Sequence, residues 1–272
     1  MKTFFGTTRA FVHRDFFIAT SYKFHLLFQL TAGFFLVTTF YFIAQLIDSQ
    51  KFAGKLEGLG VDYFSYVVIG VAATGFLHTG LSGFTERIRT AMTEGSLEMM
   101  FSCPTRPAWI MTLPCIWGFF FEALKATLVV AFAVVVFGAK LHAVNLLSCL
   151  VILLLTITSY SVFGLLSVSI VTVVKRGDPI NWAFSAASSL IAGAYFPIES
   201  LPPYLAAIAR YLPMTYTYRG LRASLLHGSV LSQVWPEIQF LAAFSFIGLP
   251  FALAATSFAV AKAKRDGTLG AF

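Results

Sequence analysis

The chain has 272 residues, of which 58% are hydrophobic and only 11% are charged. Soluble globular domains carry roughly 25% charged residues, which cover the surface that faces water. A mean hydropathy of +0.80 and 30 phenylalanines leave too little polar surface for a soluble enzyme of this length. The composition therefore excludes a soluble globular protein and favours a helical membrane protein.

Six stretches of the chain are apolar enough to cross a bilayer. A helix needs about 20 apolar residues to span the hydrocarbon core, and five windows free of Lys, Arg, Asp and Glu reach that length. The sixth stretch, 107–139, is interrupted only by Glu122 and Lys125. We expect an all-α membrane protein with one six-span domain over residues 24–262. The expected spans are 24–47, 62–84, 108–137, 144–174, 181–196 and 236–262.

Residues 1–23 are predicted to form an amphipathic helix that lies in the membrane interface. At helical spacing, Lys2 and Arg9 fall on one face, whereas Phe4 and Phe11 fall on the opposite face. The alternative is that this segment only extends the first span towards the N-terminus.

The distribution of basic residues predicts the orientation of the chain. With a cytoplasmic N-terminus, twelve Lys and Arg residues fall in the inside segments and six in the outside segments; Lys125, within a span, completes the total of 19. This asymmetry satisfies the positive-inside rule for a cytoplasmic (inner) membrane protein. Both termini, including the tail 263–272, are then expected in the cytoplasm. The basic residues would contact anionic membrane lipids, and no nucleic-acid partner is expected.

The sequence contains no Walker A motif, no HExxH and no G-x-S-x-G, so we expect no catalytic residue, no metal site and no bound cofactor. Glu122 and Lys125 are the ionisable residues at membrane depth, and their spacing puts them on one helical face. They would either neutralise each other during insertion or form a polar patch in a translocation path or subunit interface.

The longest charged stretch, 85–106, is expected in the cytoplasm between the second and third spans. Gly95 would break the preceding helix, Ser96 would cap a new one, and Glu98 would favour its first turn. The apolar face of this short helix comprises Leu97, Met100 and Phe101. Such a helix suits either docking to a cytoplasmic partner or a simple surface connection.

Residues 197–230 are too proline-rich for a span and too apolar for a soluble loop. We expect two short helical pieces, 203–211 and 215–227, in a re-entrant or interfacial hairpin on the outer side. Arg219 and Arg222 are three residues apart and would share a helical face. There they would line an anion path, bind lipid phosphate or cap helix ends.

Two motifs resemble those of the ABC-2 type transporter permeases. The run EGSLEMM (94–100), followed by Cys103-Pro104, is similar to the coupling region of that family, although Thr or Ser is commoner than cysteine at position 103. The run GAYFPIESLP (193–202), with the Pro, Thr and Arg residues of 212–222, resembles the block that precedes the last span.

The resemblance assigns roles to both motifs. It implies a coupling helix that contacts an ATPase through Glu94, Gly95, Ser96, Leu97, Glu98, Met99, Met100 and Phe101. It also implies that the hairpin caps the translocation path, with an outer gate of Phe196, Pro197, Glu199, Pro202, Arg219 and Arg222. Glu122 and Lys125 are the candidates for the path itself.

The expected function follows from this resemblance. The chain would be the permease subunit of an ATP-driven ABC exporter, pairing with a second copy of itself and with two cytoplasmic ABC ATPase subunits. ATP and Mg would bind to those partners. The aromatic-rich spans favour an amphiphilic or hydrophobic substrate, such as a drug-like molecule or a lipid. Export of a lipid-linked polysaccharide or glycolipid is the alternative, and an ATP-independent channel or an intramembrane enzyme is the alternative of another class.

Overall fold

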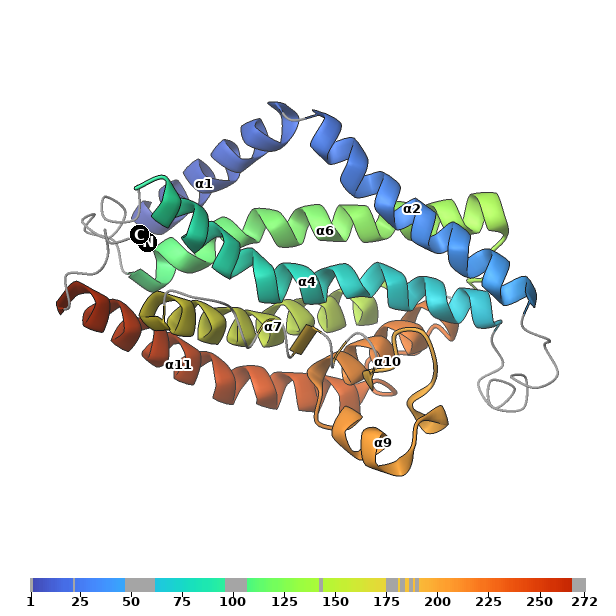
Figure 1. Cartoon of the computed structure of the whole chain (residues 1–272). Coiled ribbons are helices and arrows are strands. Elements are labelled where there is room, and N and C mark those ends of the chain that lie inside the picture. The colour runs from blue at the N-terminus through green and yellow to red at the C-terminus, as the bar shows by residue number, and fades with distance from the viewer. Residues whose placement is uncertain are drawn as a thin grey trace.

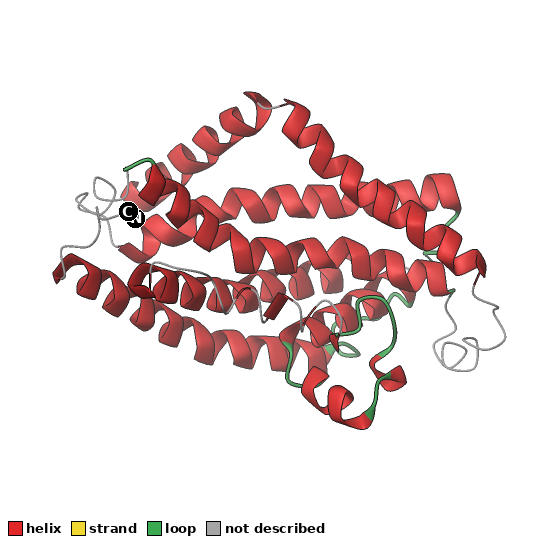
Figure 2. Ribbon diagram, viewed as in Figure 1, coloured by secondary structure: helices red, strands yellow, loops and turns green. Residues whose placement is uncertain are grey.

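The computed structural model describes residues 2–21, 23–46, 62–95, 107–141, 144–174 and 191–265, together with residues 181, 184, 185 and 188. Within these ranges the chain is helical and contains no strand (Figure 2). The elements are α1 (Lys2–Ser21), α2 (Lys23–Leu46), α4 (Tyr63–Thr93), α6 (Pro107–Phe137), α7 (Leu146–Val174), the 3-10 turn η2 (Ile198–Ser200), α9 (Pro203–Ala209), α10 (Pro213–Leu226) and α11 (Trp235–Arg265). The all-α prediction is confirmed for this part of the chain.

Five of these helices are long and apolar enough to cross a membrane. Their candidate spans are Leu27–Leu46, Tyr63–Ala91, Cys115–Phe137, Leu146–Val173 and Trp235–Ala263. They correspond to the first four expected spans and to the last. The fifth expected span, 181–196, lies largely outside the described residues, and the six-span count stays a prediction.

Helices α4, α6, α7 and α11 run side by side along most of their length (Figure 1). Helices α1 and α2 meet at an angle, and α1 packs against α6 whereas α2 packs against α4 and α6. The predicted N-terminal helix is therefore a separate element, although its position relative to a membrane stays a prediction. Helix α1 begins and α11 ends at the same end of the bundle (Figure 1).

Two short helices, α9 and α10, lie where the sequence predicts two helical pieces. Each begins at a proline, Pro203 and Pro213, because proline fits the first turn of a helix. Helix α10 packs against α4, α7 and α11, so this part of the hairpin is held inside the bundle.

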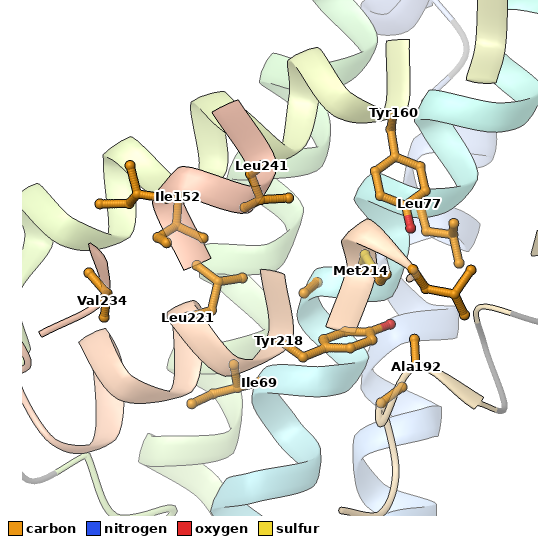
Figure 3. Close-up of a cluster of buried hydrophobic side chains, with 14 of the residues drawn as sticks. Ile69, Leu77, Ile152, Tyr160, Ala192, Met214, Tyr218, Leu221, Val234 and Leu241 are labelled. Carbon is orange, nitrogen blue, oxygen red and sulfur yellow. The ribbon is translucent and has the colours of Figure 1, made fainter. Parts of the chain in front are cut away.

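Helix α4 is the centre of the packing. Of its candidate span, 67% is buried, against 6% of the span in α2. One core cluster joins Ile69 of α4 to Tyr160 of α7, Tyr218 and Leu221 of α10, and Leu241 of α11 (Figure 3). Two further clusters join α4 to α2 and α6, and to α6, α7 and α11.

Helices α4 and α7 approach each other at a pair of glycines. A Cβ atom on Gly164 of α7 would overlap the backbone oxygen of Gly80 and would lie 2.5 Å from Cδ2 of Phe84. Membrane helices gain little from burying apolar surface against one another, because lipid tails are equally apolar, so close backbone contact of this kind contributes to their association.

We predict that Gly164→Ala destabilises the protein by about 1–3 kcal/mol, because the added methyl group would push two helix backbones apart. Gly83→Ala is the matched control, since a Cβ there would make only ordinary contact, 3.8 Å from Cγ2 of Thr79. The control should leave stability unchanged or raise it through helix propensity. Thermal unfolding in detergent, followed by circular dichroism, measures both variants. Equal melting temperatures for the two would contradict the close α4–α7 contact.

Candidate functional site

One buried arginine lies at the centre of the segment that contains α9 and α10. Arg222 of α10 is only 7% exposed, and all three of its guanidinium nitrogens donate hydrogen bonds. Nε donates to the carbonyl oxygen of Tyr66 at 3.1 Å, Nη1 to that of Gly193 at 2.8 Å, and Nη2 to that of Ala194 at 2.7 Å. The side chain thus joins α10 to the N-terminal end of α4 and to the bend that follows Ile191.

The positive charge of Arg222 is balanced by dipoles and an aromatic face. Its guanidinium carbon lies 3.4 Å from the ring centroid of Tyr66 and 5.4 Å from that of Tyr218. Among the described residues it forms no ion pair with a carboxylate. Burial lowers the pKa of Arg222, which lies outside the five candidate spans, to about 10, so it remains charged at neutral pH. The hydrogen bonds to carbonyl groups and the cation–π contact together offset the free-energy cost of burying this charge.

The local sequence explains how two consecutive carbonyls come to face the arginine. Gly193 has φ +89°, a conformation that side-chain-bearing residues rarely adopt, and it turns the chain after the helical residue Ile191. Gly70 of α4 makes room for the bend, because a Cβ there would overlap the carbonyl oxygen of Ala194 and lie 2.9 Å from Nη2 of Arg222. Pro197 is buried and leads into η2.

Further polar contacts lie along the length of α4. The hydroxyl groups of Thr74 and Tyr218 lie 3.0 Å apart, and Nδ2 of Asn181 donates to Oγ of Ser82 at 2.9 Å. Polar groups at membrane depth are costly unless they bond to one another or face a polar path. Tyr66, Thr74 and Ser82 are eight residues apart, so each is turned by about 80° around α4 from the one before, and they contact Gly193, Tyr218 and Asn181, respectively.

Glu122 and Lys125 form the ion pair that their spacing predicts. Oε2 of Glu122 and Nζ of Lys125 lie 2.6 Å apart, and Glu122 is 4% exposed. The carboxylate lies against Gly75 of α4, where a Cβ would overlap it. The side chain of Glu122 therefore packs between α6 and α4 of the same chain. Its expected place in a translocation path stays a prediction.

The two arginines of α10 occupy different environments, and their expected roles at an outer gate, on an anion path, in binding lipid phosphate or in capping helix ends stay predictions. Nη2 of Arg219 is 3.0 Å from Oε1 of Glu199, and the two side chains are 46% and 63% exposed. Arg222, in contrast, is buried and donates its hydrogen bonds to backbone carbonyls. Helix α10 is covered over most of its surface by α4, α7 and α11, and Arg219 is its exposed residue.

The other expected outer-gate residues divide in the same way. Pro197 is buried and Phe196 half-buried, whereas Glu199 and Pro202 are exposed. Of the coupling motif, the structure describes Glu94 and Gly95, which follow the end of α4 at Thr93, and Gly95 has φ +68°. The predicted helix break at Gly95 is thus present. The remaining motif residues, Ser96 to Phe101, lie outside the described residues.

The sequence analysis missed a second buried ion pair at the opposite end of α4. Oδ2 of Asp15 in α1 lies 2.7 Å from Nη1 of Arg87, and Asp15 is 6% exposed. One signal was available, since Asp15 is the lone acidic residue among residues 1–23. Its partner lies 72 residues away, which no spacing rule reveals.

Long apolar helices and the absence of a strand among the described residues define an all-helical integral membrane protein. The family model described as ABC-2 type transporter matches residues 7–226, and the chain therefore belongs to the ABC-2 type transporter family. The match includes both sequence motifs and every element from α2 to α10. Membership makes this chain a membrane permease of an ABC transporter and implies association with an ABC ATPase. A search of curated proteins found no match.

We predict that Arg222→Met destabilises the protein by about 3 kcal/mol or more, because three buried carbonyl groups would lose their guanidinium donors. Arg219→Met is the matched control in the same helix and should change stability by less than about 1 kcal/mol, since its ion pair is exposed. Unfolding in detergent measures both. A melting temperature of Arg222→Met equal to that of the control would contradict the anchoring role.

Proposed function

We propose that the chain is the permease subunit of an ATP-driven exporter in the cytoplasmic membrane and that it acts as a homodimer with two ABC ATPase subunits. The observation that carries the proposal is the family match over residues 7–226. The sequence holds no Walker A motif, which fits a subunit whose partner binds ATP and Mg.

The position of the coupling motif supports this mechanism. Glu94 and Gly95 directly follow α4, the helix with the largest buried share among the candidate spans. Because α4 packs against α2, α6, α7 and α10, a force applied at its end reaches most of the bundle. Packed helices shift between discrete arrangements as rigid units, which suits alternating access driven by closure of an ATPase dimer.

The substrate class follows from the apolar character of the chain. Aromatic residues make up 16% of the sequence, and the polar contacts of α4 with Tyr218 and Asn181 use hydroxyl and amide groups, with the buried cation of Arg222 on the same helix pair. Such surroundings suit an amphiphile with an apolar body and a small polar group. We therefore propose a drug-like amphiphile or a lipid as the substrate.

We predict that Glu98→Arg or Leu97→Asp uncouples the transporter, because either change disrupts the predicted apolar, dipole-stabilised contact with the ATPase. The tagged permease is purified with its ATPase and reconstituted in proteoliposomes. Substrate-stimulated, vanadate-sensitive ATP hydrolysis should fall about tenfold or more, which corresponds to about 1.4 kcal/mol of lost coupling. Export of rhodamine and of an NBD-labelled phospholipid is followed in parallel.

Glu86→Arg is the matched control, since Glu86 is an exposed carboxylate of α4 outside the motif. It should retain both activities. Full stimulated hydrolysis in Glu98→Arg would overturn the coupling assignment. Transport by the wild-type chain that is unchanged when ATP is omitted would favour the channel alternative instead.

A further inference from the structure

Helix α1 carries a buried carboxylate on an otherwise exposed surface. The side chain of Asp15 is 6% exposed, whereas the neighbouring residues Phe16 and Phe17 are 46% and 54% exposed. A carboxylate is rarely buried unless it is paired. The burial of Asp15 therefore needs a specific partner.

Two arginines supply that partner. Nη1 of Arg87 in α4 donates to Oδ2 of Asp15 at 2.7 Å, and Nη2 and Nε of Arg14 lie 2.8 and 2.9 Å from Oδ1. Both carboxylate oxygens are thus engaged. The Arg14 contact lies within α1, so the bond to Arg87 is the one that joins two helices.

The rest of the α1 contact is provided mainly by α6. The rings of Phe16 and Trp117 meet edge to face with centroids 5.7 Å apart. Helix α1 and α4 share no other ion pair among the described residues. Removing the charge of Asp15 would therefore leave α1 packed on α6 and remove its ion pair with the end of α4.

Arg87 lies in the last two turns of α4, which ends at Thr93 immediately before the coupling motif. We propose that Asp15 is a positioning residue that clamps α1 to this end of α4, so that α1 and the ATPase-coupling segment move as one body during transport. The inference rests on the proposed function for its consequence, but the clamp itself is a property of the chain alone.

The test uses variants that separate charge from packing. Asp15→Asn keeps the shape of the side chain and removes its charge, whereas Asp15→Glu keeps the charge and enlarges the side chain. We expect Asp15→Asn to lower transport per ATP hydrolysed about fivefold or more, the lower end of coupling between two sites. Asp15→Glu should retain most of it. Arg89→Gln is the matched control, because Arg89 is exposed and forms no ion pair with a described residue.

A double-mutant cycle assigns the effect to the pair. Arg87→Gln should reproduce the Asp15→Asn defect, and the double variant should be no worse than either single one, because both changes break the same bond. Arg87→Gln also leaves Asp15 paired with Arg14, so it tests the clamp even where Asp15→Asn fails to accumulate in the membrane.

A distance measurement tests the clamp without any transport. Spin labels are placed at the exposed positions Ala10 and Thr90 of the full chain in nanodiscs, with the three native cysteines replaced. We expect a narrow distance distribution in the wild type and in Arg89→Gln, and a broad one in Asp15→Asn and Arg87→Gln.

Equal distributions in all variants would overturn the clamp, as would an Asp15→Glu variant that is more impaired than Asp15→Asn. A wild-type complex without ATP-driven transport would overturn the proposed function alone, because the distance distributions would still report on the clamp.

Discussion

A single charge held in an apolar interior fixes the end of the bundle where α4 begins and α10 lies. Arg222 can be buried there only because three backbone carbonyls and the face of Tyr66 receive it. Those acceptors come from different parts of the chain, so satisfying one guanidinium fixes the start of α4, the bend at Gly193 and the position of α10 at the same time. A buried guanidinium without partners would cost several kcal/mol. The hydrogen bonds that hold Arg222 therefore stabilise the positions of α4, α10 and the bend together.

Other charges in the described bundle are also paired, but with side chains instead of backbone carbonyls. Glu122 and Lys125 neutralise each other where α6 meets α4, and Asp15 and Arg87 do so where α1 meets α4. Helix α4 thus takes part in all three arrangements, at its N-terminal end, at mid-length and near the motif that follows its C-terminal end. For a permease of an ABC transporter this is the helix that leads directly to the predicted ATPase contact, so the part of the chain that would receive the force is also the part most firmly held.

The sequence was a good guide to features set by composition and spacing and a poor one to long-range partners. Span positions, the break at Gly95 and the Glu122–Lys125 pair were predictable, because hydropathy, glycine conformation and helical periodicity are local properties. The separation of Arg219 from Arg222 was not, since periodicity groups residues three apart and says nothing about which neighbour covers them. Backbone acceptors such as the Ala194 carbonyl leave no trace in a side-chain pattern, and the Asp15–Arg87 pair depends on how α1 folds back over the bundle.

Three glycines of α4 limit how this helix can move. Gly70, Gly75 and Gly80 receive the carbonyl oxygen of Ala194, the carboxylate of Glu122 and the side chain of Tyr160, respectively. Successive glycines are five residues apart, so each is turned by about 140° around the helix from the one before. The three neighbouring groups therefore pack against α4 from three directions. If α4 rotated about its own axis, each of these groups would collide with a side chain of α4 beside the glycine. A displacement that begins at the end of α4 must therefore carry these neighbouring groups along with the helix.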